Sequence, residues 1–152
     1  MIRFRIVISV IGIIIQGFSA LMLIPLLAAM LSGQTDSAAA FVLCMLVGLL
    51  AGRIAWRCHN EQNFDDLNRM EGMATVGLSW LFVALVGTIP YLCFGLSFFD
   101  SLFESMSGFT TTGATILSDF SLLNSSMFFY RGYTQWLGGM GILVLFVAVL
   151  PH

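Results

Sequence analysis

Four long apolar blocks constrain this chain more than any other feature, because each is long enough to cross a bilayer as a helix. They run over Ile6–Leu31, Ala38–Trp56, Met73–Phe94 and Met127–Leu150. About 20 apolar residues span the hydrocarbon core, and a helix satisfies its backbone hydrogen bonds within the segment. The composition agrees, since 59% of the residues are hydrophobic and only 9% are charged. The sequence therefore predicts an all-α integral membrane protein.

Charge, cysteines and motifs exclude several classes of protein. A net charge of −2 gives no basic surface, so we expect no nucleic-acid partner. The three cysteines have no CxxC spacing, which favours buried thiols over a disulfide framework or a metal site. The sequence contains no G-x-S-x-G or H-E-x-x-H motif and no paired intramembrane aspartates. We therefore expect neither an enzyme nor a bound cofactor.

The arginines predict the orientation in the membrane. Five of the six lie before the first block or around the loop between the second and third blocks, whereas the stretch 91–127 has none. Cytoplasmic loops carry the excess of Arg and Lys. We therefore expect the N-terminus and the loop 57–72 in the cytoplasm, and residues 92–126 outside. Arg131 is the exception, and we expect it either to snorkel or to pair with Asp119 or with a further repeat.

The segment 95–126 between the third and fourth blocks contains a helix signal of its own. Ser101 and Glu104 fit the S-x-x-E capping box, and apolar residues then recur at helical spacing. A helix over Phe99–Phe109 is only about 15 Å long, half a membrane thickness, so it must dip in and return. Asp100 and Glu104 at its start either cap the helix or form an outer vestibule that concentrates cations.

The residues after this helix are Thr110-Thr111-Thr112-Gly113-Ala114-Thr115. A helix that ends at mid-depth directs its partial negative C-terminus towards the membrane centre. An extended strand that returns outward offers carbonyl oxygens, which can replace the hydration shell of K⁺. Gly113 permits backbone angles that are closed to other residues. The alternative interpretation is an external Thr-rich turn that caps the helix.

Two adjoining runs of sequence resemble a known family. The run DSLFESMSGFTTTGAT at 100–115 closely resembles the first pore loop of bacterial Trk-type potassium uptake subunits, in the Trk/Ktr/HKT superfamily. The run FYRGYTQWLGGMGILVLFVAVLP at 129–151 resembles the next helix of that family. The resemblance implies potassium transport across the bacterial inner membrane by a multi-pass protein with a cytoplasmic N-terminus.

The resemblance also implies which residues bind the ion. The selectivity filter would consist of Thr110, Thr111, Thr112, Gly113 and Ala114. The carbonyls of Thr111, Thr112 and Gly113 would bind K⁺, which is the transported ion rather than a cofactor. In the family, glycine at the position of Gly113 goes with K⁺ permeation and serine with Na⁺ preference.

The implied layout has three parts. They are an N-terminal transmembrane helix pair over 1–60, a cytoplasmic loop over 61–72 and a helix–pore–helix repeat over 73–152. Within the repeat, the outer helix is 73–94, the pore helix 99–109, the filter strand 110–115 and the inner helix 127–150. Gly138, Gly139 and Gly141 in the inner helix indicate either flexibility or close packing.

Family members are homodimers that bind a cytosolic TrkA-type nucleotide-binding regulatory subunit. Their chains contain four such repeats around one filter, whereas this sequence contains one. We therefore expect an incomplete N-terminal portion, inactive alone, from a truncated, frameshifted or split gene. The rival interpretation is a small non-transporting membrane protein that packs against partner helices, through the G-x-x-x-G pair Gly48 and Gly52.

Overall fold

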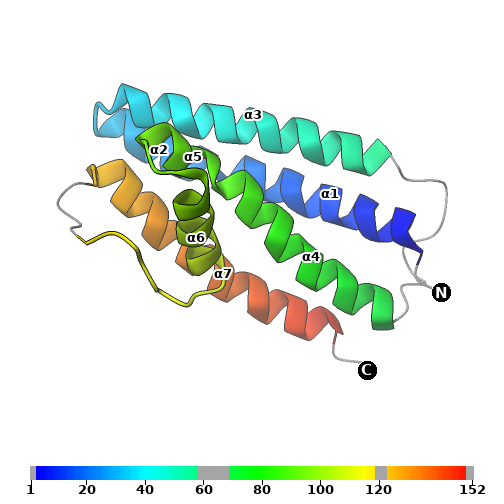
Figure 1. Ribbon diagram of the computed structural model, residues 1–152. Helices are drawn as coiled ribbons and strands as arrows, with labels where there is room; N and C mark the ends of the chain where they lie inside the picture. The colour runs from blue at the N-terminus through cyan, green and yellow to red at the C-terminus, as the bar shows by residue number, and fades with distance from the viewer. Residues whose placement is uncertain (1–2, 58–68, 119–122, 150–152) are drawn as a thin grey trace.

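The computed structural model describes residues 3–57, 69–118 and 123–149, and these ranges contain helices and no β strand (Figure 1). The helices are α1 (Phe4–Leu21), α2 (Leu23–Leu31), α3 (Thr35–Arg57), α4 (Arg69–Gly87), α5 (Ile89–Phe94), α6 (Phe98–Phe109) and α7 (Ser125–Val149). The predicted all-α membrane class is confirmed.

Three stretches of the described chain are long and apolar enough to cross a membrane, and they match the first three apolar blocks. They are Phe4–Leu31, Thr35–Arg57 and Met70–Phe94. The fourth block also forms a helix, α7, whose 25 residues reach about 37 Å at 1.5 Å per residue. In Figure 1, the starts of α1 and α4 lie at the same end of the molecule as the ends of α3 and α7.

The first span is bent next to a proline. Helix α1 gives way to α2 at Met22, three residues before Pro25. Proline has no N–H, so the carbonyl of Leu21, four residues earlier, loses its helical donor. The hydroxyl of Tyr133 on α7 donates to this carbonyl at 3.1 Å. The carbonyl that lost its helical donor to the proline therefore connects the bend to α7.

The third span is broken in the same way, where Pro90 separates α4 from α5. Pro90 withdraws the helical donor from the carbonyl of Val86. The thiol of Cys44 on α3 donates to that carbonyl, with an S···O distance of 3.3 Å. The hydroxyl of Tyr130 on α7 donates to the next carbonyl, that of Gly87, at 2.8 Å. Helices α3 and α7 are thus both attached at the break.

The glycines of α3 lie where it crosses α1. A Cβ on Gly52 would lie 2.6 Å from the carbonyl oxygen of Gly12, and a Cβ on Gly12 would lie 2.7 Å from that of Gly52. Gly48 likewise faces Ser19. The Gly48 and Gly52 pair does allow a close approach, but the neighbouring helix is the chain's own α1 and not that of a partner.

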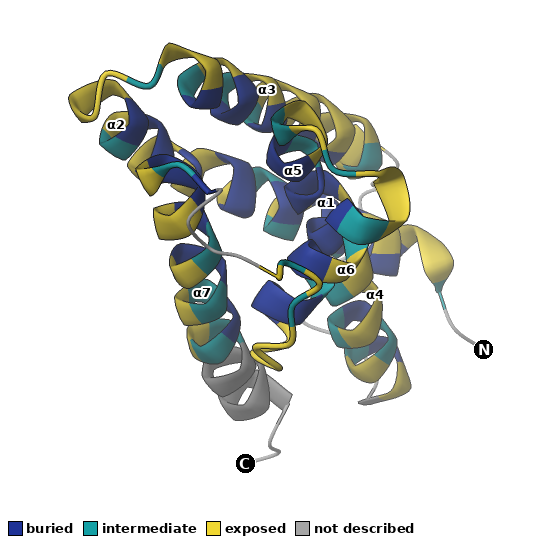
Figure 2. Cartoon of the chain, turned by 60° about the vertical axis from the view of Figure 1, so that its left-hand side comes forward, coloured by how far each residue is buried: buried dark blue, intermediate teal, exposed yellow. Residues whose placement is uncertain are grey.

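The core lies where α1, α3, α5 and α7 meet, and aromatic side chains fill it. The ring of Tyr130 lies 5.2 Å from that of Phe41 and 5.4 Å from that of Tyr91, and all three side chains are fully buried. Figure 2 shows the buried faces turned inward, while the outer face of α3 is exposed. Large apolar residues such as Leu50 and Ile54 lie on that exposed face. This is the surface of a protein whose solvent is lipid.

Candidate functional site

The short helix α6 begins after Ser97, which caps it. The Ser97 hydroxyl accepts a hydrogen bond from the Asp100 N–H at 3.3 Å and donates to the Asp100 carboxylate at 2.7 Å. The predicted capping box of Ser101 and Glu104 is therefore wrong, because both residues lie one turn further along the helix. This Ser-x-x-Asp pair differs from a capping box, because the acid accepts from the serine hydroxyl rather than from the serine backbone N–H.

The two acids predicted for an outer vestibule lie in different environments. Asp100 is half-buried in the first turn of α6, where the helix dipole favours a negative charge. Glu104 is fully buried. A role for Asp100 in concentrating cations stays a prediction, while the carboxylate of Glu104 faces the protein interior.

Glycines let α6 lie close to both α4 and α7. A Cβ on Gly138 of α7 would lie 2.8 Å from the carbonyl carbon and 3.0 Å from the Cα of Phe109, the last residue of α6. A Cβ on Gly87 of α4 would lie 2.7 Å from the Phe109 ring. Ser105 also donates to the carbonyl of Ala84 on α4 at 2.7 Å. These contacts favour the close-packing interpretation of Gly138.

The C-terminus of α6 is closed by a Schellman-type cap in which the left-handed residue is a threonine. The Thr111 N–H donates to the carbonyl of Gly108 at 3.0 Å, and the Thr112 N–H donates to that of Ser107 at 3.1 Å. Thr110 is the capping residue. Thr111 has φ 57°, a conformation that costs a β-branched residue about 1–3 kcal/mol. No sequence signal points to this strain, because nothing in the run Thr110-Thr111-Thr112 distinguishes one threonine from the next.

The segment that follows, residues 110–117, is called the threonine loop below. It has no helical structure beyond the turn at its start, and residues 110–114 are exposed. Gly113 has φ 73°, in the left-handed region that glycine was predicted to permit. The carbonyls of Thr111 and Thr112 accept no hydrogen bond from the described part of the chain. The carbonyls of Gly113 and Ala114 accept from Arg131, at 3.4 and 3.2 Å.

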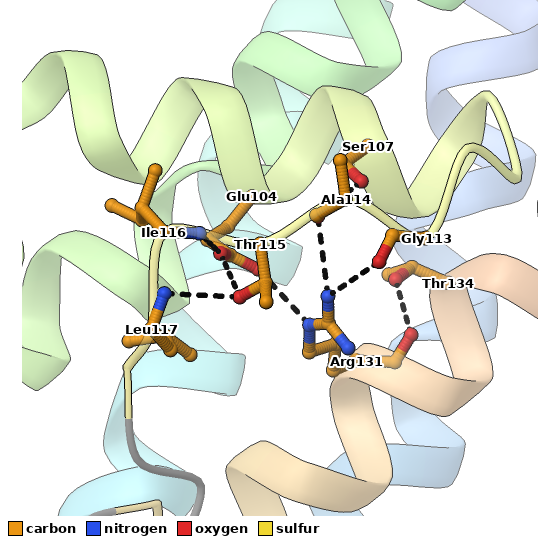
Figure 3. Close-up of polar contacts among 9 residues, drawn as sticks. All are labelled: Glu104, Ser107, Gly113, Ala114, Thr115, Ile116, Leu117, Arg131 and Thr134. Carbon is orange, nitrogen blue, oxygen red and sulfur yellow. Dashed lines mark hydrogen bonds and ion pairs between the residues drawn. The ribbon is translucent and has the colours of Figure 1, made fainter.

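A buried ion pair lies behind the threonine loop and joins α6 to α7 (Figure 3). The Arg131 Nε donates to Glu104 Oε2 at 3.0 Å, and the two side chains are 13% and 0% exposed. The other carboxylate oxygen, Oε1, accepts from the Thr115 hydroxyl at 2.5 Å and from the Ile116 N–H at 2.8 Å. Glu104 was not among the partners expected for Arg131. Asp119, which was one of them, lies outside the described residues.

Comparison with known proteins identifies the family of this arrangement. The family model for TrkH, described as a cation transport protein, matches residues 33–152. The chain belongs to the TrkH family. It is 37% identical to the Trk system potassium uptake protein TrkH of Vibrio parahaemolyticus over 98% of this chain and 31% of that protein. The TrkH protein of Escherichia coli K12 is 38% identical over the same shares, and TrkG of that strain is 31% identical.

A solved structure supports the TrkH-family fold. The crystal structure of the potassium transporter TrkH from Vibrio parahaemolyticus matches 99% of this chain with a TM-score of 0.88 and 35% identity. The match covers 32% of that protein. This chain therefore spans about a third of the length of the curated TrkH relatives that it matches. The names of these relatives describe transport rather than an enzymatic reaction.

Proposed function

We propose that this TrkH-family chain provides the N-terminal part of a potassium uptake subunit, in which residues 110–114 form one quarter of the ion filter. The observation that carries the proposal is the end of α6, where Thr111 and Thr112 are exposed and their carbonyls accept no hydrogen bond from the described residues. Such oxygens are available to replace water around K⁺. The 12 residues of α6 reach about 18 Å, which is too short to cross the hydrocarbon core of about 30 Å.

The proposal includes the partners and the setting that the family resemblance implies. Three further repeats would surround the filter, a second copy would complete a homodimer, and a TrkA-type regulatory subunit would bind from the cytoplasm. The membrane would be the bacterial inner membrane, with the N-terminus inside. The end of the molecule where α1 begins and α3 ends carries Arg3, Arg53 and Arg57, which supports this orientation (Figure 1).

Reporter fusions test the orientation. We expect a reporter that works only in the periplasm to be inactive when fused after Asn63 and active when fused after Asn124. A reporter that works only in the cytoplasm should give the reverse pattern. Periplasmic activity after Asn63 would contradict the proposed topology.

Ion uptake tests the filter itself. The chain is joined to the remaining repeats of a TrkH relative, and Rb⁺ and Na⁺ uptake are measured at matched membrane abundance, with the 152-residue chain alone as the inactive reference. We expect Gly113→Ser to lower the preference for Rb⁺ over Na⁺. Gly113→Val should nearly abolish uptake, because a β-branched residue at φ 73° costs about 1–3 kcal/mol and turns the carbonyls.

Gly33→Val is the matched control for this experiment. Gly33 also has positive φ, 68°, and also has open space around it, but it lies in the turn between α2 and α3. We expect this variant to pay a similar strain and to keep the wild-type ratio of Rb⁺ to Na⁺ uptake. Wild-type selectivity in both Gly113 variants would mean that the threonine loop is only an outer turn. The rival packing function gains no support, because α1 occupies the Gly48 and Gly52 face.

A further inference from the structure

The ion pair between Glu104 and Arg131 makes additional hydrogen bonds that would not be needed only to join α6 to α7. A buried pair is stabilising only when its remaining donors and acceptors are also satisfied, because desolvation of the two charges is costly. Here both oxygens of Glu104 accept hydrogen bonds, and those to Oε1 come from the threonine loop, from Thr115 and Ile116. Arg131 likewise donates to loop carbonyls. Both members of the pair therefore make hydrogen bonds to the loop in addition to their bond to each other.

The loop is held at two places, and the ion pair is one of them. Upstream, Thr111 and Thr112 are held by the cap of α6. Downstream, the bonds to helix side chains come from Glu104, from Arg131 and from Ser107, whose hydroxyl donates to the Ala114 carbonyl at 2.5 Å. Loss of the pair would leave Ser107 as the hydrogen-bonding contact between the downstream half and the helices within the described residues.

The pair also affects the electrostatic potential next to the carbonyls of Gly113 and Ala114. The guanidinium of Arg131 lies 3.2 Å from the carbonyl oxygen of Ala114 and 3.4 Å from that of Gly113. An uncompensated positive charge at that distance would repel a cation bound to the same loop. Glu104 neutralises it at 3.0 Å, inside the protein where solvent screens little. Arg131 can therefore hold the backbone without lowering the affinity of the loop for cations.

We propose that Glu104 and Arg131 are positioning residues that set the cation affinity and selectivity of the threonine loop. They fix its downstream half, and Glu104 offsets the positive charge of Arg131 beside its carbonyls. This inference rests on the proposed function, that residues 110–114 line the ion path. Neither residue is assigned a contact with the ion.

The test uses the same completed pore, with Rb⁺ and Na⁺ uptake measured over a range of concentrations. We expect E104Q to raise the half-saturating Rb⁺ concentration about tenfold, equal to 1.4 kcal/mol, because it removes the negative charge that lies 3.0 Å from Arg131 next to the loop. The double variant E104Q/R131Q removes both charges and should recover about half of that change on a logarithmic scale. Both variants should lower the Rb⁺ to Na⁺ ratio, because the loop loses its charged support.

The chain contains a matched control pair. Arg3 and Glu71 form a second ion pair at 2.9 Å, with the Glu71 side chain 3% exposed, at the end of the bundle where α1 and α4 begin. We expect E71Q to change membrane abundance and maximal rate only. If E104Q shifts neither half-saturation nor the Rb⁺ to Na⁺ ratio beyond E71Q, the pair is merely structural and the inference is wrong.

Two further variants, Thr115→Val and Gly113→Val, distinguish a failure of this inference from a failure of the proposed function. If E104Q and the double variant do not accumulate, Thr115→Val decides, because it keeps both charges and removes the bond to Glu104, together with the bond that the Leu117 N–H donates to the same hydroxyl at 3.1 Å. We expect it to lower the Rb⁺ to Na⁺ ratio about threefold, the effect of one ordinary hydrogen bond, and an unchanged ratio would overturn the inference. Wild-type uptake in Gly113→Val would instead refute the proposed function. Loss of uptake in Gly113→Val with a silent E104Q would refute only the present inference.

Discussion

A pair of neighbouring glycines on α7 offers a sharp test of how α6 is positioned. Gly138 faces the backbone of Phe109, and an added Cβ would lie 2.8 Å from its carbonyl carbon and closer still to its oxygen. Gly139 faces only the methyl group of Thr111, at 3.7 Å, an ordinary contact distance. We expect Gly138→Ala to destabilise the chain relative to Gly139→Ala.

The two alanines separate packing from helix propensity. Replacing glycine by alanine inside a helix stabilises it by about 1 kcal/mol, and this gain is common to both positions. At Gly138, however, the new methyl group meets backbone atoms, which cannot rotate away as a side chain does. Overpacking of this kind costs about 1–3 kcal/mol. The difference between the variants should therefore be about 1–3 kcal/mol, with Gly139→Ala at or above wild-type stability.

The assay is thermal denaturation of the detergent-solubilised chain, followed by size-exclusion chromatography of what remains monomeric. At about 2–4 °C per kcal/mol for a chain of this size, Gly138→Ala should melt roughly 2–12 °C below Gly139→Ala. In the completed pore, Gly138→Ala should also change the Rb⁺ to Na⁺ ratio, because Phe109 carries the start of the threonine loop. Equal melting temperatures would refute the close contact between Gly138 and α6.

The same thermal assay checks two more residues. Tyr133→Phe leaves the carbonyl of Leu21 without its donor in apolar surroundings, so we expect a loss of about 1–3 kcal/mol, and an unchanged melting temperature would mean that the carbonyl finds another partner. Thr111→Gly relieves the strain of a β-branched residue at φ 57°, so we expect a gain of about 1 kcal/mol. If the glycine variant melts lower than wild type, contacts of the threonine side chain outweigh the backbone strain.

The local capping pattern placed the start of α6 one turn too late, at Ser101 instead of Ser97. Two Ser-x-x-acid pairs follow one another here, Ser97 with Asp100 and then Ser101 with Glu104. Both satisfy the rule for a helix start, and glutamate is the commoner acid at the third position. The helix starts at the first pair, which leaves Glu104 free to meet Arg131 27 residues later. The choice depends on a long-range contact that no local window contains.

The sequence determined the helical, membrane-embedded class, the presence of a short helix before Thr110 and a positive φ at Gly113 that favours glycine. These follow from hydrophobic length and from backbone geometry, which act within a few residues. Only the tertiary structure decided that Thr111 is left-handed and which donors the carbonyls freed by Pro25 and Pro90 accept. The tertiary structure alone also brings Glu104 and Arg131 together, where both make hydrogen bonds to the threonine loop. A buried polar group must find its partner wherever the fold brings one, and sequence distance does not record that position.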